Sequence, residues 1–96
     1  MNAVRPGLAT SLAGHDKDTV YVIIREDEAY YYVCDGKSRT VSKPKKKKKI
    51  HMQPVIHLRE TMAERIDEIR RLAQGTETAE TADGMIRELL SSYKER

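Results

Sequence analysis

Phenylalanine and tryptophan are absent from this chain of 96 residues, and only one cysteine, Cys34, is present. Without the two apolar aromatic residues, the core must consist of Val, Ile, Leu, Met and a few Tyr. We therefore expect only marginal stability for a domain of this size. A single cysteine excludes an internal disulfide framework and a cysteine-rich zinc site, and it indicates a reducing compartment.

Long hydrophobic runs are also missing. No stretch approaches the roughly 20 apolar residues of a membrane-spanning helix. Residues 1–13 contain one Arg and only short apolar pieces, unlike a signal peptide. We therefore expect a cytoplasmic protein with no membrane partner.

Acidic residues are absent from residues 36–59, although the chain holds fifteen of them elsewhere. That segment contains nine Lys and Arg residues, so its formal charge is +9, and the rest of the chain is −6. Six of the nine are lysines within residues 43–49. A block of like charges cannot bury itself, so the asymmetry favours a local contact with a polyanion, above all nucleic acid.

The first half of the chain has the pattern of short β-strands. Apolar and β-branched residues predict strands at 8–12, 19–25, 30–34 and 38–41, and a last short strand within 50–58. We expect Val20, Val22 and Ile24 to share an inward face, and Asp35-Gly36 to form a tight hairpin turn. Five such strands predict a small barrel, with the lysine run as a loop leading into its last strand.

The periodicity changes to that of an α-helix after residue 58. One apolar stripe comprises Leu58, Met62, Ile66, Ile69 and Leu72, and a second comprises Ile86, Leu89, Leu90 and Tyr93. The second helix is predicted to run from residue 82 to about residue 94.

Capping signals accompany both predicted helices. Thr61 and Glu64 have the spacing of a capping box, and Gly75 predicts the end of the first helix. Thr81 or Asp83 is expected to cap the second helix.

These patterns divide the chain into a β domain at residues 1–58 and a helical hairpin at residues 59–96. The fold class is mainly β with C-terminal α, an α+β fold. Each helical stripe must be covered by something. The hairpin can pack on the β domain, self-associate or bind another protein, and short connections favour packing within the chain.

The lysine run has the reach to contact several phosphates. Fully extended, residues 43–49 span at most about 25 Å, a sizeable part of the roughly 34 Å turn of a duplex. Lysine is a flexible point charge, so the run supplies affinity and little sequence discrimination. If six lysines each neutralise a phosphate, log affinity falls against log salt with a slope of about −4 to −5. The alternatives are a merely solvated loop and a nuclear localisation signal, which the position between two strands disfavours.

The turn before the second predicted strand is another candidate contact. Gly14 permits a turn there, and His15 and Lys17 can donate to phosphate from it. Asp16 and Asp18 would repel the same phosphate. An ordinary β-turn is the alternative interpretation.

Three consecutive tyrosines, Tyr30, Tyr31 and Tyr32, form the next feature. A strand alternates its faces, so at least one ring should point outward, where it can stack on an unpaired base. Core packing or simple β preference is the alternative explanation.

No pattern indicates a metal site, a cofactor or catalysis. His15, His51 and His57 lack the spacing of a ligand set, and Cys34 has no base partner in the sequence. We expect no enzyme and no catalytic residue. The carboxylates of the helices are better explained as facing solvent near arginines.

The order of these motifs resembles a known family. The matching segments are residues 11–17, the Val-rich strand after them, residues 32–36, residues 43–48 and residues 50–52. Over residues 6–54 the chain resembles KOW-domain proteins, specifically small bacterial RNA-binding proteins related to large-subunit ribosomal proteins of the fourteen-e type.

The resemblance implies an SH3-like five-stranded β-barrel that docks on structured RNA, most typically ribosomal RNA. Two positions depart from the family pattern, which usually has Arg where His15 stands and Gly where Asp18 stands. The first departure removes a permanent charge, because histidine is mostly neutral at pH 7. The second places an acid in the turn presumed to face RNA.

The sequence thus predicts a non-enzymatic, ribosome-associated RNA-binding protein without a cofactor. The predicted RNA-binding residues are Lys43, Lys45, Lys46, Lys47, Lys48, Lys49, Lys17, His15, Lys37, Arg39 and His51. The alternative is a protein-interaction adaptor that uses the apolar face of the C-terminal helices.

Overall fold

The computed structural model describes residues 6–94. Its elements are, in chain order, β1 (Leu8–Ser11), β2 (Val20–Glu26), β3 (Tyr30–Cys34), β4 (Lys45–Lys48), the 3-10 turn η1 (Lys49–His51), β5 (Met52–Pro54), α1 (Glu60–Ala73) and α2 (Ala79–Lys94). The fold is α+β, with one five-stranded antiparallel sheet and two helices. Residues 1–5 and 95–96, at the outer ends of the two predicted units, lie outside the described residues.

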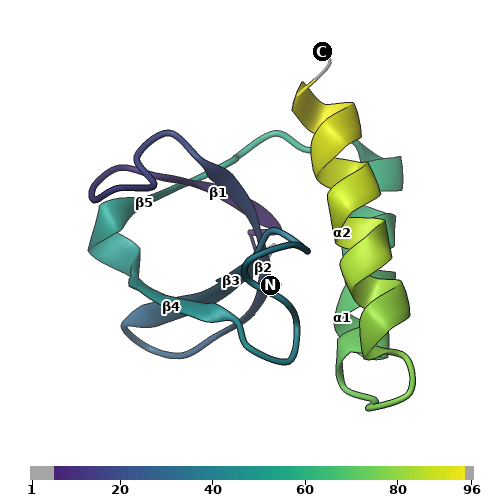
Figure 1. The fold of residues 1–96 in the computed structure, drawn as a ribbon. Coiled ribbons are helices and arrows are strands. Elements are labelled where there is room, and N and C mark those ends of the chain that lie inside the picture. Colours follow the sequence, from purple (N-terminus) through teal and green to yellow (C-terminus); the bar gives the residue numbers. More distant parts are fainter. Residues whose placement is uncertain (1–5, 95–96) are drawn as a thin grey trace.

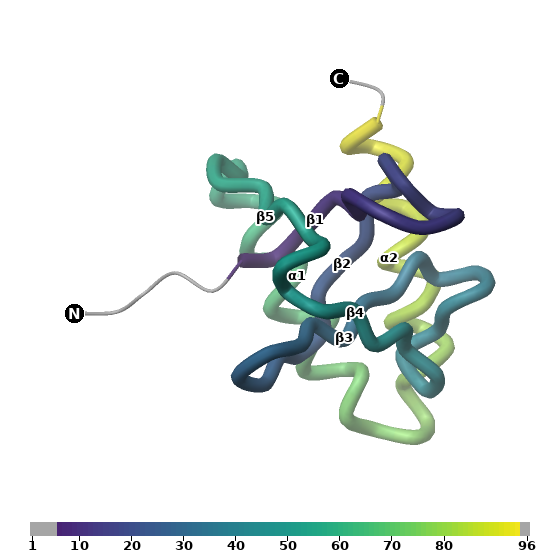
Figure 2. Tube along the Cα trace, turned by 90° about the vertical axis from the view of Figure 1, so that its left-hand side faces the viewer, coloured from purple at the N-terminus to yellow at the C-terminus, as the bar shows by residue number. Residues whose placement is uncertain are grey.

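The sheet has the strand order β4-β3-β2-β1-β5. It curls, so that its two edge strands come together where η1 joins them (Figure 1; Figure 2). Within residues 6–94 no ladder joins β4 to β5, so the sheet is not closed. The two helices lie side by side on one side of the sheet (Figure 1).

Strand β2 is buried on both faces, which explains its run of apolar and β-branched residues. Val22 is fully buried and belongs to the cluster between the sheet and the helices, with Val20 and Ile24 packed against that cluster. Tyr21 and Ile23 belong to a second cluster on the other face. The predicted face of Val20, Val22 and Ile24 therefore exists, and it faces the helices.

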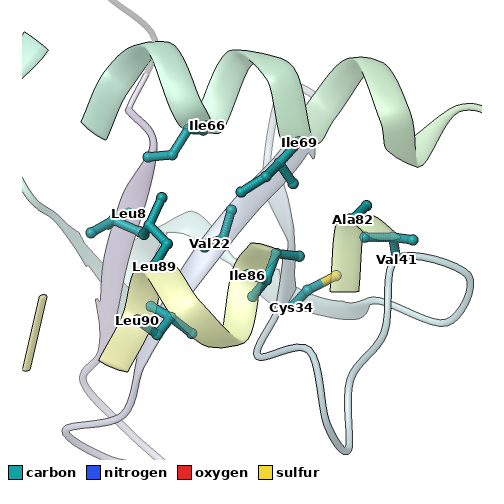
Figure 3. Close-up of a cluster of buried hydrophobic side chains, with 10 residues drawn as sticks. All are labelled: Leu8, Val22, Cys34, Val41, Ile66, Ile69, Ala82, Ile86, Leu89 and Leu90. Carbon is teal, nitrogen blue, oxygen red and sulfur yellow. The ribbon is translucent and has the colours of Figure 1, made fainter. Parts of the chain in front are cut away.

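The cluster between the sheet and the helices is the larger of the two, and Figure 3 shows its side chains converging from both. It comprises Leu8, Val22, Cys34, Val41, Ile66, Ile69, Ala82, Ile86, Leu89 and Leu90. Both predicted helical stripes contribute to it, which confirms the helical periodicity. The β part and the helical part of the chain thus share one core.

The predicted fourth strand at residues 38–41 is wrong. Only an isolated bridge joins Thr40 to Lys43 there. The Val41 N–H is used elsewhere, because it donates to Asp83 Oδ1 of α2 at 2.8 Å. The strand that returns along β3 is the lysine run itself, so residues 45–48 form an edge strand and not the predicted loop.

The predicted capping residues are also wrong, because they lie inside the helices and not at the positions that precede them. Helix α1 begins at Glu60, so Thr61 lies in its first turn, and the N-cap residue Arg59 makes no side-chain capping hydrogen bond. Helix α2 begins at Ala79, one turn earlier than predicted, so Thr81 and Asp83 lie inside it.

The end of α1 is close to the predicted position. The helix ends at Ala73, and the Gly75 N–H donates to the Leu72 carbonyl at 3.2 Å.

Gly36 lets the turn after β3 approach α2. Its φ of 80° lies in the left-handed region, and a Cβ there would lie 2.6 Å from the Asp83 carbonyl oxygen. Arg87 Nη1 donates to the Gly36 carbonyl at 2.6 Å. The predicted tight hairpin turn at Asp35-Gly36 is wrong, because these residues open a ten-residue connection to β4.

A β-bulge interrupts the pairing of β2 with β3. Ile23 pairs with Val33, but the next pair is Arg25 with Tyr32, so Ile24 is the extra residue. Arg70 of α1 binds at this point, since its Nε donates to the Ile23 carbonyl at 2.9 Å. The helix is thereby fixed against the irregular part of the strand.

Candidate nucleic-acid interface

The lysine run alternates between two environments because it is a strand. Successive residues of a strand point to opposite faces. Lys45 and Lys47 lie opposite Val33 and Tyr31, and we call this side of β4 the paired face. Lys46 and Lys48 lie opposite Tyr32 and Tyr30, and we call that side the open face.

On the paired face, both lysines bind one carboxylate. Lys45 Nζ lies 2.9 Å from Asp16 Oδ2, and Lys47 Nζ lies 3.1 Å from Asp16 Oδ1. Asp16 also accepts from Ser11 Oγ at 2.9 Å and from the Tyr21 hydroxyl at 2.7 Å. Four donors thus surround a carboxylate whose side chain is 13% exposed. From the sequence we expected this acid to repel phosphate. In the structure its negative charge is compensated by the ion pairs with Lys45 and Lys47.

The hydrogen bonds to Asp16 set its protonation state. Burial alone would raise the pKa of this carboxyl, but the bonds from Tyr21, the two lysines and Ser11 outweigh burial and hold the pKa well below its usual range. For Tyr21, burial and then the bond to Asp16 raise the pKa of the phenol. The network is therefore a charged carboxylate with neutral tyrosine throughout the neutral pH range.

Lys49 follows β4 in η1 and is paired as well. Its Nζ lies 2.7 Å from Glu26 Oε1 at the end of β2, and this hydrogen bond raises the pKa of the lysine. Three of the six lysines of the run therefore have acidic partners from outside residues 36–59.

The remaining three lysines, Lys43, Lys46 and Lys48, are exposed. Within residues 6–94 none of them forms an ion pair. Lys46 Nζ lies over the ring of Tyr30, 4.3 Å from its centroid. These lysines are available to a phosphate without breaking a salt bridge.

The tyrosine run divides in the same way. Tyr31 is buried in the second cluster, and Tyr30 and Tyr32 are half-buried on the open face. The Tyr32 hydroxyl donates to Asp27 Oδ2 at 2.9 Å. Arg25, which the sequence did not single out, lies over the Tyr32 ring with Cζ 4.2 Å from the centroid. Core packing is therefore confirmed for Tyr31, and Tyr30 and Tyr32 lie on the opposite face of the strand, as strand alternation predicts.

The turn at residues 12–18 is tied to β4 through Asp16. Lys47 Nζ also donates to the Ala13 carbonyl at 3.3 Å. His15 and Lys17 are exposed on either side of Asp16. These two predicted residues thus flank the carboxylate that binds Lys45 and Lys47, and within residues 6–94 neither forms an ion pair with the lysine run.

Asp18 has the backbone conformation of a glycine. Its φ is 75°, and its N–H donates to the Ser11 carbonyl at 2.8 Å. Non-glycine residues seldom adopt this region, and Asp tolerates it better than most. A glycine would adopt this conformation with less strain.

The other predicted residues lie at the ends of the lysine segment. Lys37 and Arg39 are exposed in the turn after β3, and their N–H groups donate to Asp35 Oδ1 at 2.8 and 2.9 Å. His51 is exposed in η1, where its carbonyl accepts from the Leu12 N–H at 2.9 Å.

Cys34 is a buried core residue whose thiol donates to the Thr40 carbonyl at 3.2 Å. Burial raises the pKa of this thiol to about 12, which leaves it protonated and unreactive at neutral pH. In residues 6–94 no group of three His, Cys, Asp or Glu side chains is arranged to hold a metal ion.

The structure adds three residues that the sequence did not point to as partners: Asp16 and Glu26 as lysine acceptors, and Arg25 as a cation stacked on tyrosine. Strand alternation within the lysine run would have pointed to these contacts, but a run of lysines does not by itself indicate a strand.

Over the part of the chain that is described, neither helix is long and apolar enough to cross a membrane. A scan against protein-family models and a search of curated proteins find no match to this chain.

Proposed function

We propose that the chain is a non-enzymatic RNA-binding protein of the KOW type, with an SH3-like barrel built from its curled sheet. Its ligand is structured RNA, most typically ribosomal RNA, and its location is cytoplasmic. The observation that carries the proposal is the edge strand β4, which presents Lys46 and Lys48 to solvent on one face.

The charge of the exposed surface supports this proposal. Lys43, Lys46 and Lys48 are exposed, and within the described residues no carboxylate lies within 4 Å of their amino groups. Lys37 and Arg39 add exposed cations in the turn after β3. An edge strand rich in lysine also resists pairing with another sheet, so the same residues keep this edge open for a ligand.

The alternative function, an adaptor that works through the helical stripes, has less support. The stripe residues Ile66, Ile69 and Ile86 are almost completely buried against the sheet. An adaptor or a dimer built on those faces would first have to separate the helices from β2. We therefore retain RNA binding as the function.

A salt titration tests the proposal. If only the three exposed lysines of the run neutralise phosphates, log affinity for a structured RNA should fall against log salt with a slope of about −2 to −3. Lys17, Lys37 and Arg39 would each steepen that slope by just under one if they also bind phosphate. Fluorescence anisotropy with a labelled RNA hairpin measures it, and a slope near zero would overturn the proposal.

Crosslinking in cells, followed by sequencing of the attached RNA, tests the identity of the ligand. Ribosomal RNA should dominate the reads. Reads confined to messenger RNA would contradict the ribosomal part of the proposal and leave RNA binding in place.

A further inference from the structure

Three side chains form a row across the open face at the bulge in β2. Arg25 pairs with Tyr32, and Tyr32 pairs with Lys46 on the next strand. Directly paired residues of an antiparallel sheet lie on the same face, about 4.5–5.5 Å apart. The order across the strands is therefore cation, aromatic ring, cation. Strands β2, β3 and β4 lie next to one another in this part of the sheet (Figure 2).

The bulge is what places Arg25 in this row. With regular pairing after Ile23 and Val33, Ile24 would lie opposite Tyr32 and Arg25 opposite Tyr31. The extra residue shifts Arg25 by one position and turns it to the face of Tyr32. Bulges commonly redirect a side chain in this way near functional sites.

Arg70 of α1 holds the strand next to the bulge. Its Nε binds the Ile23 carbonyl at 2.9 Å, and its Nη2 binds the Pro6 carbonyl at 2.7 Å. These bonds anchor the strand at the residue before the irregularity. The packing of α1 on the sheet therefore helps to fix the position of Arg25, two residues after Ile23.

The ring beneath Arg25 is fixed as well. The Tyr32 hydroxyl donates to Asp27 Oδ2, and Asp27 Oδ1 accepts from the Tyr30 N–H at 2.8 Å and the Ala29 N–H at 3.0 Å. These backbone hydrogen bonds and the one from Tyr32 lower the pKa of the Asp27 carboxyl. The carboxylate therefore stays charged and continues to accept the hydrogen bond from the Tyr32 hydroxyl.

Arg25 itself is exposed, with Cζ 4.2 Å from the centroid of the Tyr32 ring. The guanidinium group thus contacts the ring while the side chain remains accessible to a ligand. Guanidinium planes, like aromatic rings, are surfaces on which unpaired RNA bases stack. Within residues 6–94 Arg25 forms no ion pair with a carboxylate. Its position over the Tyr32 ring is therefore not explained by a salt bridge.

We propose that Arg25, backed by Tyr32, is a stacking site for an unpaired nucleobase, so that the preferred ligand is RNA with a bulge or loop. This inference rests on the proposed RNA binding and deepens it. Lys46 and Lys48 on the same face bind the phosphates that flank the stacked base. Stacking accepts any base, so the site selects unpaired structure and not a sequence.

The test compares two RNAs without a loop, a fully paired stem made of two separate strands and the same stem with a bulge of unpaired adenosines. Fluorescence anisotropy at one salt concentration gives both affinities. The wild-type protein should bind the bulged stem more tightly by about 5- to 150-fold for a single stacked base. Arg25→Lys keeps the charge but loses the plane, so it should lose most of that preference and keep its affinity for the paired stem.

Arg71→Lys is the matched control, because Arg71 is an exposed arginine of α1 that pairs with Glu68 at 3.4 Å. It should leave both affinities unchanged. Tyr32→Leu, which removes the ring under Arg25, should reduce the preference as Arg25→Lys does, and thermal unfolding of each variant verifies the fold.

The outcomes distinguish a failure of the stacking site from a failure of RNA binding. Equal binding of both RNAs by the wild type, or an undiminished preference in Arg25→Lys, overturns the stacking site and leaves RNA binding standing. Binding of neither RNA by the wild type overturns the proposed function itself.

Discussion

The two faces of β4 carry the same side chain in opposite roles. On the paired face, Lys45 and Lys47 bind Asp16, and the side chain of Lys47 is only 11% exposed. On the open face, Lys46 and Lys48 are exposed and unpaired within the described residues. Neighbouring lysines of one strand therefore differ in role: those on one face stabilise the fold through ion pairs, and those on the other face contact solvent.

This difference shows that a count of charges overstates the charge available to a ligand. The segment 36–59 has no acid of its own, but Asp16 and Glu26 reach it from the first hairpin. A lysine that must leave a carboxylate to bind a phosphate gains much less than an unpaired one, since it exchanges one ion pair for another. The lysines of the open face should thus dominate the interaction with RNA.

Removing Asp16 should break the paired face and have the largest effect. Asp16→Ala leaves Lys45, Lys47 and the Tyr21 hydroxyl without their common acceptor in a largely buried place. We expect a loss of about 2–3 kcal/mol in the free energy of unfolding, or roughly 10–20 °C in melting temperature. Urea and thermal unfolding measure both.

Acid pH should reproduce the loss in the wild type. A carboxyl whose pKa is depressed on folding adds stability above its unfolded value of 3.8, and this contribution disappears as the pH falls towards the folded value. The stability gap between wild type and Asp16→Asn should therefore be constant above about pH 5 and shrink at lower pH. A gap that is independent of pH down to acid unfolding would contradict a charged Asp16 network.

Substituting the two lysine pairs separately tests the comparison directly. Lys46→Gln with Lys48→Gln should lower RNA affinity about tenfold at moderate salt and flatten the salt slope by about 1.5, with little effect on unfolding. The matched variant, Lys45→Gln with Lys47→Gln, should lower the unfolding temperature and change the affinity less.

Anisotropy titrations at several salt concentrations, together with melting curves, give the four values. Equal losses of affinity in both variants would show that the paired lysines bind phosphate as readily as the exposed ones. The distinction between the two faces would then be wrong for RNA binding.

Asp18 offers the smallest and most specific change. Asp18→Gly places the residue best suited to φ of 75° at this position and removes an exposed negative charge near His15 and Lys17. We expect a gain of about 0.5–1 kcal/mol in stability and a modest gain in RNA affinity. Asp18→Asn keeps the tolerance for this conformation and removes only the charge, so it should share the gain in affinity and not the gain in stability.

Much of the fold follows from local patterns. The β3 strand at residues 30–34 and the two helical stripes form as predicted, because their alternation and helical spacing match faces that the core covers. The strand predicted at residues 38–41 fails because a non-local contact captures it: the Val41 N–H binds Asp83, 42 residues away in sequence. A run of lysines has little intrinsic preference for a strand, so its pairing with β3 is a tertiary effect.

The candidate site was predicted only in outline. The lysines, His15, Lys17 and the tyrosines were recognised as candidates, but their division between faces was not. Asp16 lies 29 residues from Lys45 and 31 from Lys47, and local sequence reasoning does not link them. Arg25 reaches Tyr32 only because of a bulge that no sequence pattern announced.

By itself, the sequence determined that this protein combines a β half with a helical half and carries a dense positive charge in residues 43–49. These properties depend on composition and on neighbours within a few positions, which are visible in the chain. The tertiary structure alone decided which lysines remain available, because strand alternation sends every second one towards acids that the fold brings from the first hairpin. Charge is a property of residues, but its availability depends on what lies within a few ångströms after folding.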